Sequence, residues 1–444
     1  MIAVRLCMDL RVFKIVFFTA SVCVWGMKSN AQTNDKKDRK WTFHFMNTVV
    51  YQSHDGFTVP YSGIKSLSNK YEAQITVRNT WFVGHRFGKH TSIYINPELA
   101  GGSGLSGVAG IAGFPNGEAF RVGSGQPKVY FARAFVRHHI PLTSETEPMT
   151  NSFNQLKEDL PVKRITITAG KFSLLDYFDG SKFANDGRTQ FMNWALMTGG
   201  AYDFSSDTRG NTWGTVVEYI TPNRSIKLAC TIPSFAPNGP TFDTNFPDAS
   251  AFDFDFRQKI NLFKTPVTVG FTAFRNSTLG VLFNDQIYTN PDSVAKSRTN
   301  YHLKYGFVVN LEQEFKNWAW FTTNSWADGK AENYGFTQID NSISAGVVIF
   351  GHLWKHYDAN LGLAGVINGL SPDQQSFLAR GGNGFIIGDG KLTYAPEQVV
   401  EIYYSARVSK NMYLTLDYQY IWNMAFNSDR GSIGVWGIRS HIEL

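Results

Sequence analysis

Residues 388–444 read GDGKLTYAPEQVVEIYYSARVSKNMYLTLDYQYIWNMAFNSDRGSIGVWGIRSHIEL, and three alternating runs within this stretch decide the fold. Successive side chains of a β-strand point to opposite faces, so an alternating run predicts a strand with one apolar and one polar face. The runs occupy 399–408, 412–422 and 436–444. In the central run the apolar face is formed by Met412, Leu414, Leu416, Tyr418, Tyr420 and Trp422.

This alternation is typical of two kinds of β-sheet protein. In a soluble sandwich the apolar face packs into a core and the polar face meets bulk water. In a transmembrane barrel the apolar face meets lipid, and the polar face meets a water-filled interior. A soluble strand usually has about five or six residues, whereas about ten are needed to cross a bilayer at a tilt. The eleven alternating residues at 412–422 therefore favour the barrel.

The first 31 residues have the features of a cleaved secretory signal. Arg5, Arg11 and Lys14 precede a short apolar stretch at 15–25, and Ser-Asn-Ala at 29–31 offers a small-x-small cleavage site. The apolar stretch is too short for a membrane-anchoring helix. We therefore expect residues 1–31 to be removed, 32–40 to form a polar leader, and 41–444 to form one exported β-domain.

Charge and cysteine content support this picture. Residues 1–31 carry four basic and one acidic side chain, so their removal lowers the formal net charge from +6 to +3. The remaining charge is not clustered as nucleic-acid binding requires, and we expect no nucleic-acid partner. Only Cys230 would remain, which excludes an intramolecular disulfide. No interior segment reaches the ~18 to 20 apolar residues of a spanning helix, so a membrane fold has to be a closed barrel.

Alternating runs continue along the rest of the chain. They give fifteen or sixteen candidate antiparallel strands, one of them at 192–204, and turn dipeptides such as Asn238-Gly239 separate several of them. Helical signals are few. Ser371 and Pro372 predict the start of one short helix at 371–380, and a second short surface element is expected at 154–160.

Motifs of enzyme chemistry are weak or absent. Residues 102–107 match G-x-G-x-x-G, but Pro-Asn-Gly at 115–117 prevents the helix that a dinucleotide site requires. A glycine-rich loop that folds inward is the preferred interpretation. The sequence contains no H-E-x-x-H, G-x-S-x-G, P-loop or C-x-x-C motif. We therefore predict no enzyme activity, no cofactor and no metal site.

Charged and aromatic residues on the polar strand faces are candidates for the wall of a pore. A paired-carboxylate interpretation of Asp253 and Asp255 stays open, because a glycosidase site uses two carboxyl groups at a defined separation, but pore lining is favoured. Aromatic rings on these faces would also suit sugar stacking. The alternation gives these candidates: Arg78, Asp253, Asp255, Arg257, Glu401, Tyr403, Arg407, Asp417, Gln419 and Arg439.

Several long motifs, in order along the chain, resemble the carbohydrate-selective porins of the OprB family. They are GKF at 170–172, FANDGRTQFMNWAL at 183–196, GGAYDFSSDTRGNTWG at 199–214, APNGP at 236–240, and the C-terminal stretch quoted above. One departure is Leu444, which stands where such barrels usually end in phenylalanine. The resemblance covers most of the chain beyond the expected signal.

The resemblance implies a sixteen-stranded barrel in the outer membrane of a Gram-negative bacterium, with a pore narrowed by inward loops. By motif position, Asp186, Arg188, Asn193 and Trp194 are expected on an inward segment beside the pore. The leading hypothesis is passive diffusion of carbohydrates and similar small hydrophilic solutes. The alternatives are a porin for a divalent metal ion or an organic acid, and, third, an outer-membrane enzyme or structural barrel. Expected partners are outer-membrane lipid and the barrel-assembly machinery, and a homo-oligomer stays open.

Overall fold

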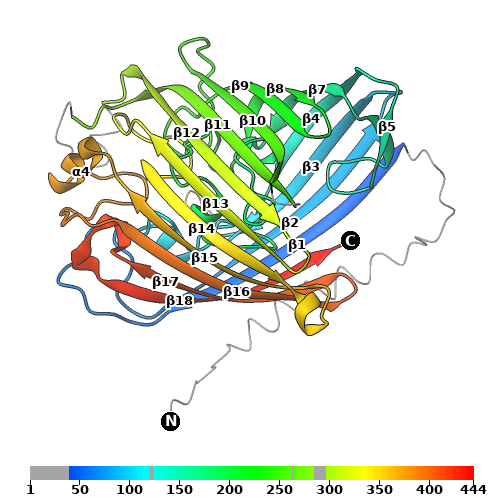
Figure 1. Cartoon of the computed structure of the whole chain (residues 1–444). Helices are drawn as coiled ribbons and strands as arrows, with labels where there is room; N and C mark the ends of the chain where they lie inside the picture. The colour runs from blue at the N-terminus through cyan, green and yellow to red at the C-terminus, as the bar shows by residue number, and fades with distance from the viewer. Residues whose placement is uncertain (1–39, 120–124, 263–264, 285–296) are drawn as a thin grey trace. The chain divides into compact units, whose positions relative to one another are not determined.

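The strands of the chain form one closed antiparallel barrel (Figure 1). The computed structural model describes residues 40–119, 125–262, 265–284 and 297–444. The expected signal at 1–31 and all but the last residue of the expected leader lie outside these ranges. Sixteen strands make up the wall, which confirms the predicted all-β transmembrane barrel of about sixteen strands.

Each barrel strand is hydrogen-bonded to two neighbours, and the last strand pairs with the first. The barrel strands are β1 (Trp41–His54), β2 (Glu72–Arg86), β3 (Thr91–Gly101), β4 (Lys128–Pro141), β7 (Arg164–Phe172), β8 (Thr212–Ile220), β9 (Arg224–Thr231), β10 (Ser250–Leu262), β11 (Thr265–Gly280), β12 (Asn300–Glu314), β13 (Trp318–Ala327), β14 (Asn341–Phe350), β15 (Ala359–Gly369), β16 (Glu397–Ser409), β17 (Met412–Trp422) and β18 (Ser432–Glu443).

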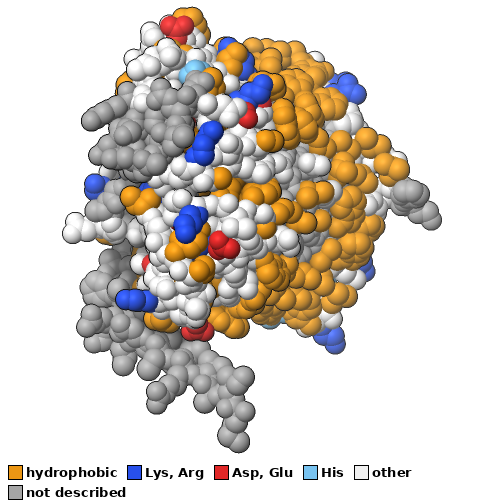
Figure 2. Space-filling model, turned by 90° about the vertical axis from the view of Figure 1, so that its left-hand side faces the viewer, with side chains coloured by type: hydrophobic (Ala, Val, Ile, Leu, Met, Phe, Trp, Pro, Cys, Tyr) orange, Lys and Arg blue, Asp and Glu red, His pale blue; other side chains and the backbone are white. Residues whose placement is uncertain are grey.

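The alternation in the sequence becomes an inside and an outside of the wall. On β17, Leu414 and Leu416 are exposed on the outer face, whereas Thr415 and Asp417 are buried on the inner face. Figure 2 shows hydrophobic side chains gathered over a broad part of the outer surface, with most charged side chains outside it. In the described residues, no helix is long and apolar enough to span a membrane.

The two ends of the barrel differ in the length of their connections. At one end, most neighbouring strands are joined by short turns such as 87–90 and 410–411, and the longest connection there is 142–163. At the other end the connections are long, and two of them, 102–127 and 173–211, contribute many buried residues to the barrel interior. The glycine-rich segment at 102–107 therefore belongs to an inward loop, as predicted.

The short elements outside the wall correct two expectations. The helix predicted at 371–380 is present as α4 (Pro372–Ala379), with Ser371 Oγ accepting a hydrogen bond from Gln374 N at 3.1 Å. The strand predicted at 192–204 is wrong, since this stretch folds inward and contains the short helix α2 (Trp194–Met197). The element expected at 154–160 ends in β6 (Glu158–Pro161), which pairs with β5 (Thr146–Met149). Tertiary contacts with the wall outweigh the local alternation at 192–204.

Candidate functional site

Buried carboxylates on the wall hold the inward segments in place. Glu401, on β16, accepts hydrogen bonds from the backbone N–H groups of Met192 and Asn193 at 2.6 and 2.9 Å. Glu397, four residues earlier on the same face of β16, accepts hydrogen bonds from Ala112 N at 2.9 Å and Gly113 N at 2.7 Å. Each carboxyl group satisfies two backbone N–H groups that would otherwise be left unpaired in the barrel interior, where an unpaired donor is costly. Both inward segments are thereby fixed to the same strand.

Aromatic packing joins the two inward segments to each other and to the wall. The Trp194 ring stacks on Phe114 of the other segment, with centroids 5.2 Å apart and planes 12° apart. Phe191 meets Tyr403 of the wall edge to face at 4.9 Å. Such pairs add to the free energy of apolar burial. The inward segments are therefore packed as a core against β10–β17 and do not hang free in the barrel.

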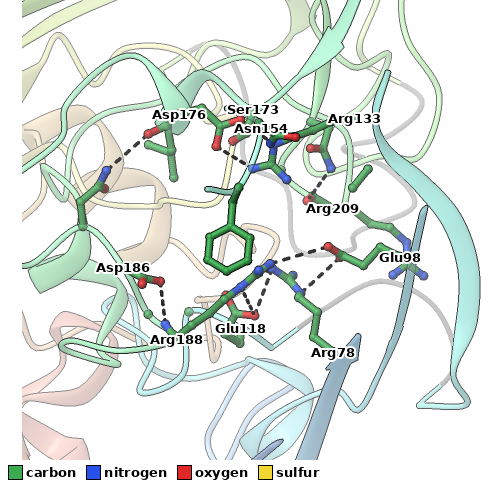
Figure 3. Close-up of a pocket in the computed structure, with 18 of the residues that line it drawn as sticks. Arg78, Glu98, Glu118, Arg133, Asn154, Ser173, Asp176, Asp186, Arg188 and Arg209 are labelled. Atoms are coloured by element: carbon green, nitrogen blue, oxygen red, sulfur yellow. Dashed lines mark hydrogen bonds and ion pairs between the residues drawn. The ribbon is translucent and has the colours of Figure 1, made fainter. Parts of the chain in front are cut away.

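The space that remains open lies against the opposite part of the wall. A cavity of about 600 Å³ is bounded by β1–β4, by several parts of the 173–211 segment, by residues 117–119 of the 102–127 segment, by residues 153–155 and by Phe336. Figure 3 shows the charged side chains that converge on it. The cavity lies inside the closed barrel beside both inward segments, so a solute that enters it meets these side chains.

Four charged side chains of alternating sign form a cluster on one side of the cavity (Figure 3). Arg78 on β2 lies 3.3 Å from Glu98 on β3 and 3.1 Å from Glu118 of an inward segment. Arg188, of the other inward segment, lies 3.7 Å from Glu98 and 3.6 Å from Glu118. Each carboxylate thus faces both guanidinium groups. This arrangement, here called the charged quartet, joins the wall to both inward segments.

Three further arginines line the cavity. Arg133 on β4 donates two hydrogen bonds of 2.6 Å to the carboxylate of Asp176, a bidentate pair. Arg137 donates to a backbone carbonyl and to a tyrosine hydroxyl rather than to a carboxylate. The guanidinium carbon of Arg209 lies 4.0 Å from the ring centroid of Tyr130, in cation–π geometry. The cavity wall therefore presents arginine donors beyond those of the charged quartet.

Asp186 stabilises the turn that carries Arg188. Its carboxylate accepts hydrogen bonds from Arg188 N at 2.9 Å and from the Thr189 hydroxyl at 2.7 Å. Burial by itself raises the pKa of Asp186, but these hydrogen bonds and the charge of Arg188 outweigh burial and leave the pKa below its usual value. The carboxylate is therefore ionised at neutral pH. Five arginines and four carboxylates line the cavity, which gives it a formal charge of +1.

The structure brings four of the predicted pore residues to this cavity: Arg78, Asp186, Arg188 and Trp194. The other predicted residues lie on the inner face of the wall or on an inward segment, and none of them lines the cavity. Glu401, Asp417 and Gln419 are covered by the inward segments, and Asn193 is the buried N-cap of α2. Arg407 pairs with Asp358 at the short-turn end.

The remaining predicted residues also anchor inward segments. Asp253 accepts a 2.7 Å hydrogen bond from the Tyr202 hydroxyl, and Arg257 donates to the Gly180 carbonyl while lying 3.3 Å from Asp255. Tyr403 packs under Phe191, and Arg439 holds the turn of Arg188. Asp253 and Asp255, the pair considered for glycosidase chemistry, are both buried, with 2% and 0% of their surface exposed.

Sequence reasoning missed six charged residues of the cavity: Glu98, Glu118, Arg133, Arg137, Asp176 and Arg209. Three of them had a usable signal, since Glu98, Arg133 and Arg137 are charged residues within strands that alternate. The other three lie on loops, where no periodicity tells which side chains reach the channel. Their positions depend on how the inward segments fold.

A closed barrel with an apolar outer face and a charged internal passage defines a passive outer-membrane porin. The sequence matches the model of the carbohydrate-selective porin, OprB family, over residues 65–444. The chain belongs to this family.

Solved structures agree at the level of the fold. The high-pH structure of OprB from Pseudomonas putida has a TM-score of 0.67 at 14% identity, and the match covers 91% of this chain and 94% of that chain. The outer-membrane channel DcaP of Acinetobacter baumannii has a TM-score of 0.50 at 11% identity, with 94% and 99% covered. No curated protein sequence matches the chain. The fold and the family are those of a channel.

Proposed function

We propose that this porin passes carbohydrates and similar small hydrophilic solutes by diffusion, without a chemical step. The observation that carries the proposal is the charged quartet, in which donors and acceptors alternate on one side of the cavity. A sugar hydroxyl both donates and accepts hydrogen bonds, so it can bind a guanidinium and a carboxylate in turn. The family to which the chain belongs is described as carbohydrate-selective.

The size and the apolar parts of the cavity support the same solute class. A volume of about 600 Å³ lies within the usual range of small-molecule sites. The rings of Phe82 and Phe153 lie 4.8 Å apart at the cavity wall. Sugar rings carry C–H groups on their faces that pack on aromatic rings, while their edges bind polar groups. The cavity offers both kinds of surface at once.

Planar-bilayer recordings of the purified protein test this proposal. We expect stepwise conductance that neutral mono- and disaccharides partly block. The substitution Arg78→Gln should weaken the block, because the charged quartet then loses its central donor. Lys182→Gln, an exposed lysine outside the cavity, is the matched control. A conductance that no sugar reduces would contradict the proposal.

The charge of the cavity supports a second candidate, passage of small organic anions. Five arginines against four carboxylates leave a surplus of one positive charge, and fixed positive charge raises the local concentration of anions. Liposome swelling separates the two solute classes. Faster swelling in neutral sugars than in carboxylates of similar size favours the first proposal, and the reverse order favours the second.

A further inference from the structure

The outer wall has a groove across β8–β11. The groove has a volume of about 490 Å³. Small side chains, Cys230 on β9 and Ala273 on β11, leave the space, and the larger side chains of Leu228, Phe252 and Phe254 border it. These residues lie in adjacent rows of the sheet, since Phe252 pairs with Cys230 and Phe254 pairs with both Leu228 and Ala273. The groove is thus an apolar recess of the lipid-facing surface.

One cation borders this apolar recess. Arg275 lies opposite Phe252 on one side and Tyr305 on the other, and it points outward with its neighbours. Its guanidinium carbon lies 5.8 Å from the Phe252 ring centroid. Within the described part of the chain, no carboxylate forms an ion pair with it. An arginine on an apolar membrane surface keeps its charge, so it needs water or an anion beside it.

The position of Arg275 along the barrel indicates the depth in the membrane. It lies five residues before the end of β11 at Gly280, where one of the long connections begins. Long connections face the outside of the cell and short turns face the periplasm. Tyr305 and Trp326 pack nearby with ring centroids 6.0 Å apart, as in the aromatic belts at headgroup level. Arg275 therefore lies near the headgroups of the outer leaflet.

We propose that this groove binds a phosphorylated lipid of the outer leaflet, with one acyl chain in the recess and a phosphate on Arg275. The guanidinium presents several N–H donors in a plane, which suits a phosphate bound in bidentate fashion. An acyl chain would fill the apolar recess, whereas a free phosphate bound to Arg275 would leave the recess empty. The apolar recess and the Arg275 charge lie side by side, as do the acyl chains and the phosphate of such a lipid.

The same wall contains a matched control. Arg224, at the opposite end of β9, is also exposed and also lies over a phenylalanine ring, with its guanidinium carbon 5.9 Å from the Phe256 centroid. It does not border the groove. Both arginines carry the same charge and lie over a phenylalanine ring. Only Arg275 borders the groove, and the two residues lie near opposite sides of the membrane.

Native mass spectrometry of the detergent-purified full-length protein, titrated with lipid A, tests the proposal. We expect one lipid A to bind with an affinity that falls at least tenfold in Arg275→Gln and stays unchanged in Arg224→Gln. Ala273→Leu, which fills the recess and keeps the charge, should also weaken binding. Lipid A without phosphates should bind the wild-type protein no better than intact lipid A binds Arg275→Gln. Heat-dependent gel mobility and channel conductance verify that each variant is folded.

Three results would overturn the proposal. The first is equal affinity of wild type and Arg275→Gln for lipid A. The second is an equal loss in Arg224→Gln, because binding would then follow surface charge alone. The third is a lipid-free oligomer that Arg275→Gln dissociates, which would make this face a contact between copies of the chain.

Discussion

Arg439, on the last strand, donates a 2.7 Å hydrogen bond to the carbonyl oxygen of Gly187, a residue 252 positions earlier in the chain. The same nitrogen donates to Gln190 O at 2.8 Å. The turn between these two carbonyls carries Arg188 into the charged quartet. A side chain of the barrel wall thus sets the position of a side chain in the channel.

Replacing Arg439 by lysine should loosen this turn without removing the buried charge. Lysine presents a single ammonium group, which cannot reproduce the planar fork that binds both carbonyls and the Thr415 hydroxyl. We expect noisier single-channel current and weaker block by sugars in planar bilayers. Arg407→Lys at the short-turn end serves as the control. Identical current noise in wild type and Arg439→Lys would mean that other contacts hold the turn.

Neutralising Glu98 should make the channel more selective for anions. The substitution Glu98→Gln raises the formal charge of the cavity from +1 to +2, because one of its four carboxylates is lost. An increase of about twofold or more in the anion-to-cation permeability ratio is expected. The reversal potential in a potassium chloride gradient measures it. Glu314 is an exposed carboxylate outside the cavity, and Glu314→Gln should leave the reversal potential unchanged. An equal shift of the reversal potential in both variants would show that the location of Glu98 in the cavity does not matter.

Glu401→Gln should destabilise the inward segments. Glu401 now accepts hydrogen bonds from the N–H groups of both Met192 and Asn193. The oxygen of a glutamine side chain can accept one of these hydrogen bonds, but its NH₂ group would face the other N–H and leave it unpaired. Leaving a buried donor unpaired costs about 1–3 kcal/mol. The midpoint of the heat-induced mobility shift on gels should fall. Glu443→Gln, which is partly exposed near the end of β18, is the control, and a fall of the same size there would argue against this explanation.

Asp179 should make stability depend on pH. Burial raises the pKa of this loop carboxyl from 3.8 to about 7. Between these two values the folded chain binds more protons at Asp179 than the unfolded chain, so its contribution to stability falls as pH rises through this window. Each unit of difference between the folded and unfolded pKa of Asp179 changes the free energy of unfolding by about 1.4 kcal/mol across this window.

Asp179→Asn should remove this pH dependence. The residue has a φ of 51°, a left-handed conformation that asparagine tolerates. Unfolding midpoints of wild type and variant, measured from pH 4 to pH 8, should differ least at acid pH, where Asp179 is neutral. Parallel curves at all pH values would show that another group titrates.

The strands of this barrel could be predicted from alternation, whereas the channel could not. Leu416 and Asp417 fall on the outer and inner faces as their sequence positions require. Arg78 and Glu401, however, have the same signal, a charge on the polar face of a strand, and only Arg78 reaches the cavity. The difference arises because an inward segment covers Glu401. Residues 192–204 alternate like a strand, yet carboxylate anchors and aromatic packing bind them inside the barrel.

The inward segments pack against one part of the barrel wall and leave a cavity beside another, so the wall has two arcs with different roles. The arc that contains Glu397 and Glu401 binds the backbone of the inward segments. The arc of β2–β4 lines the cavity. Substitutions at Glu98 or Arg133 can therefore change what the channel admits while the anchors at Glu397 and Glu401 stay in place. A barrel built in this way can acquire new solute preferences by a few changes on one side of its wall.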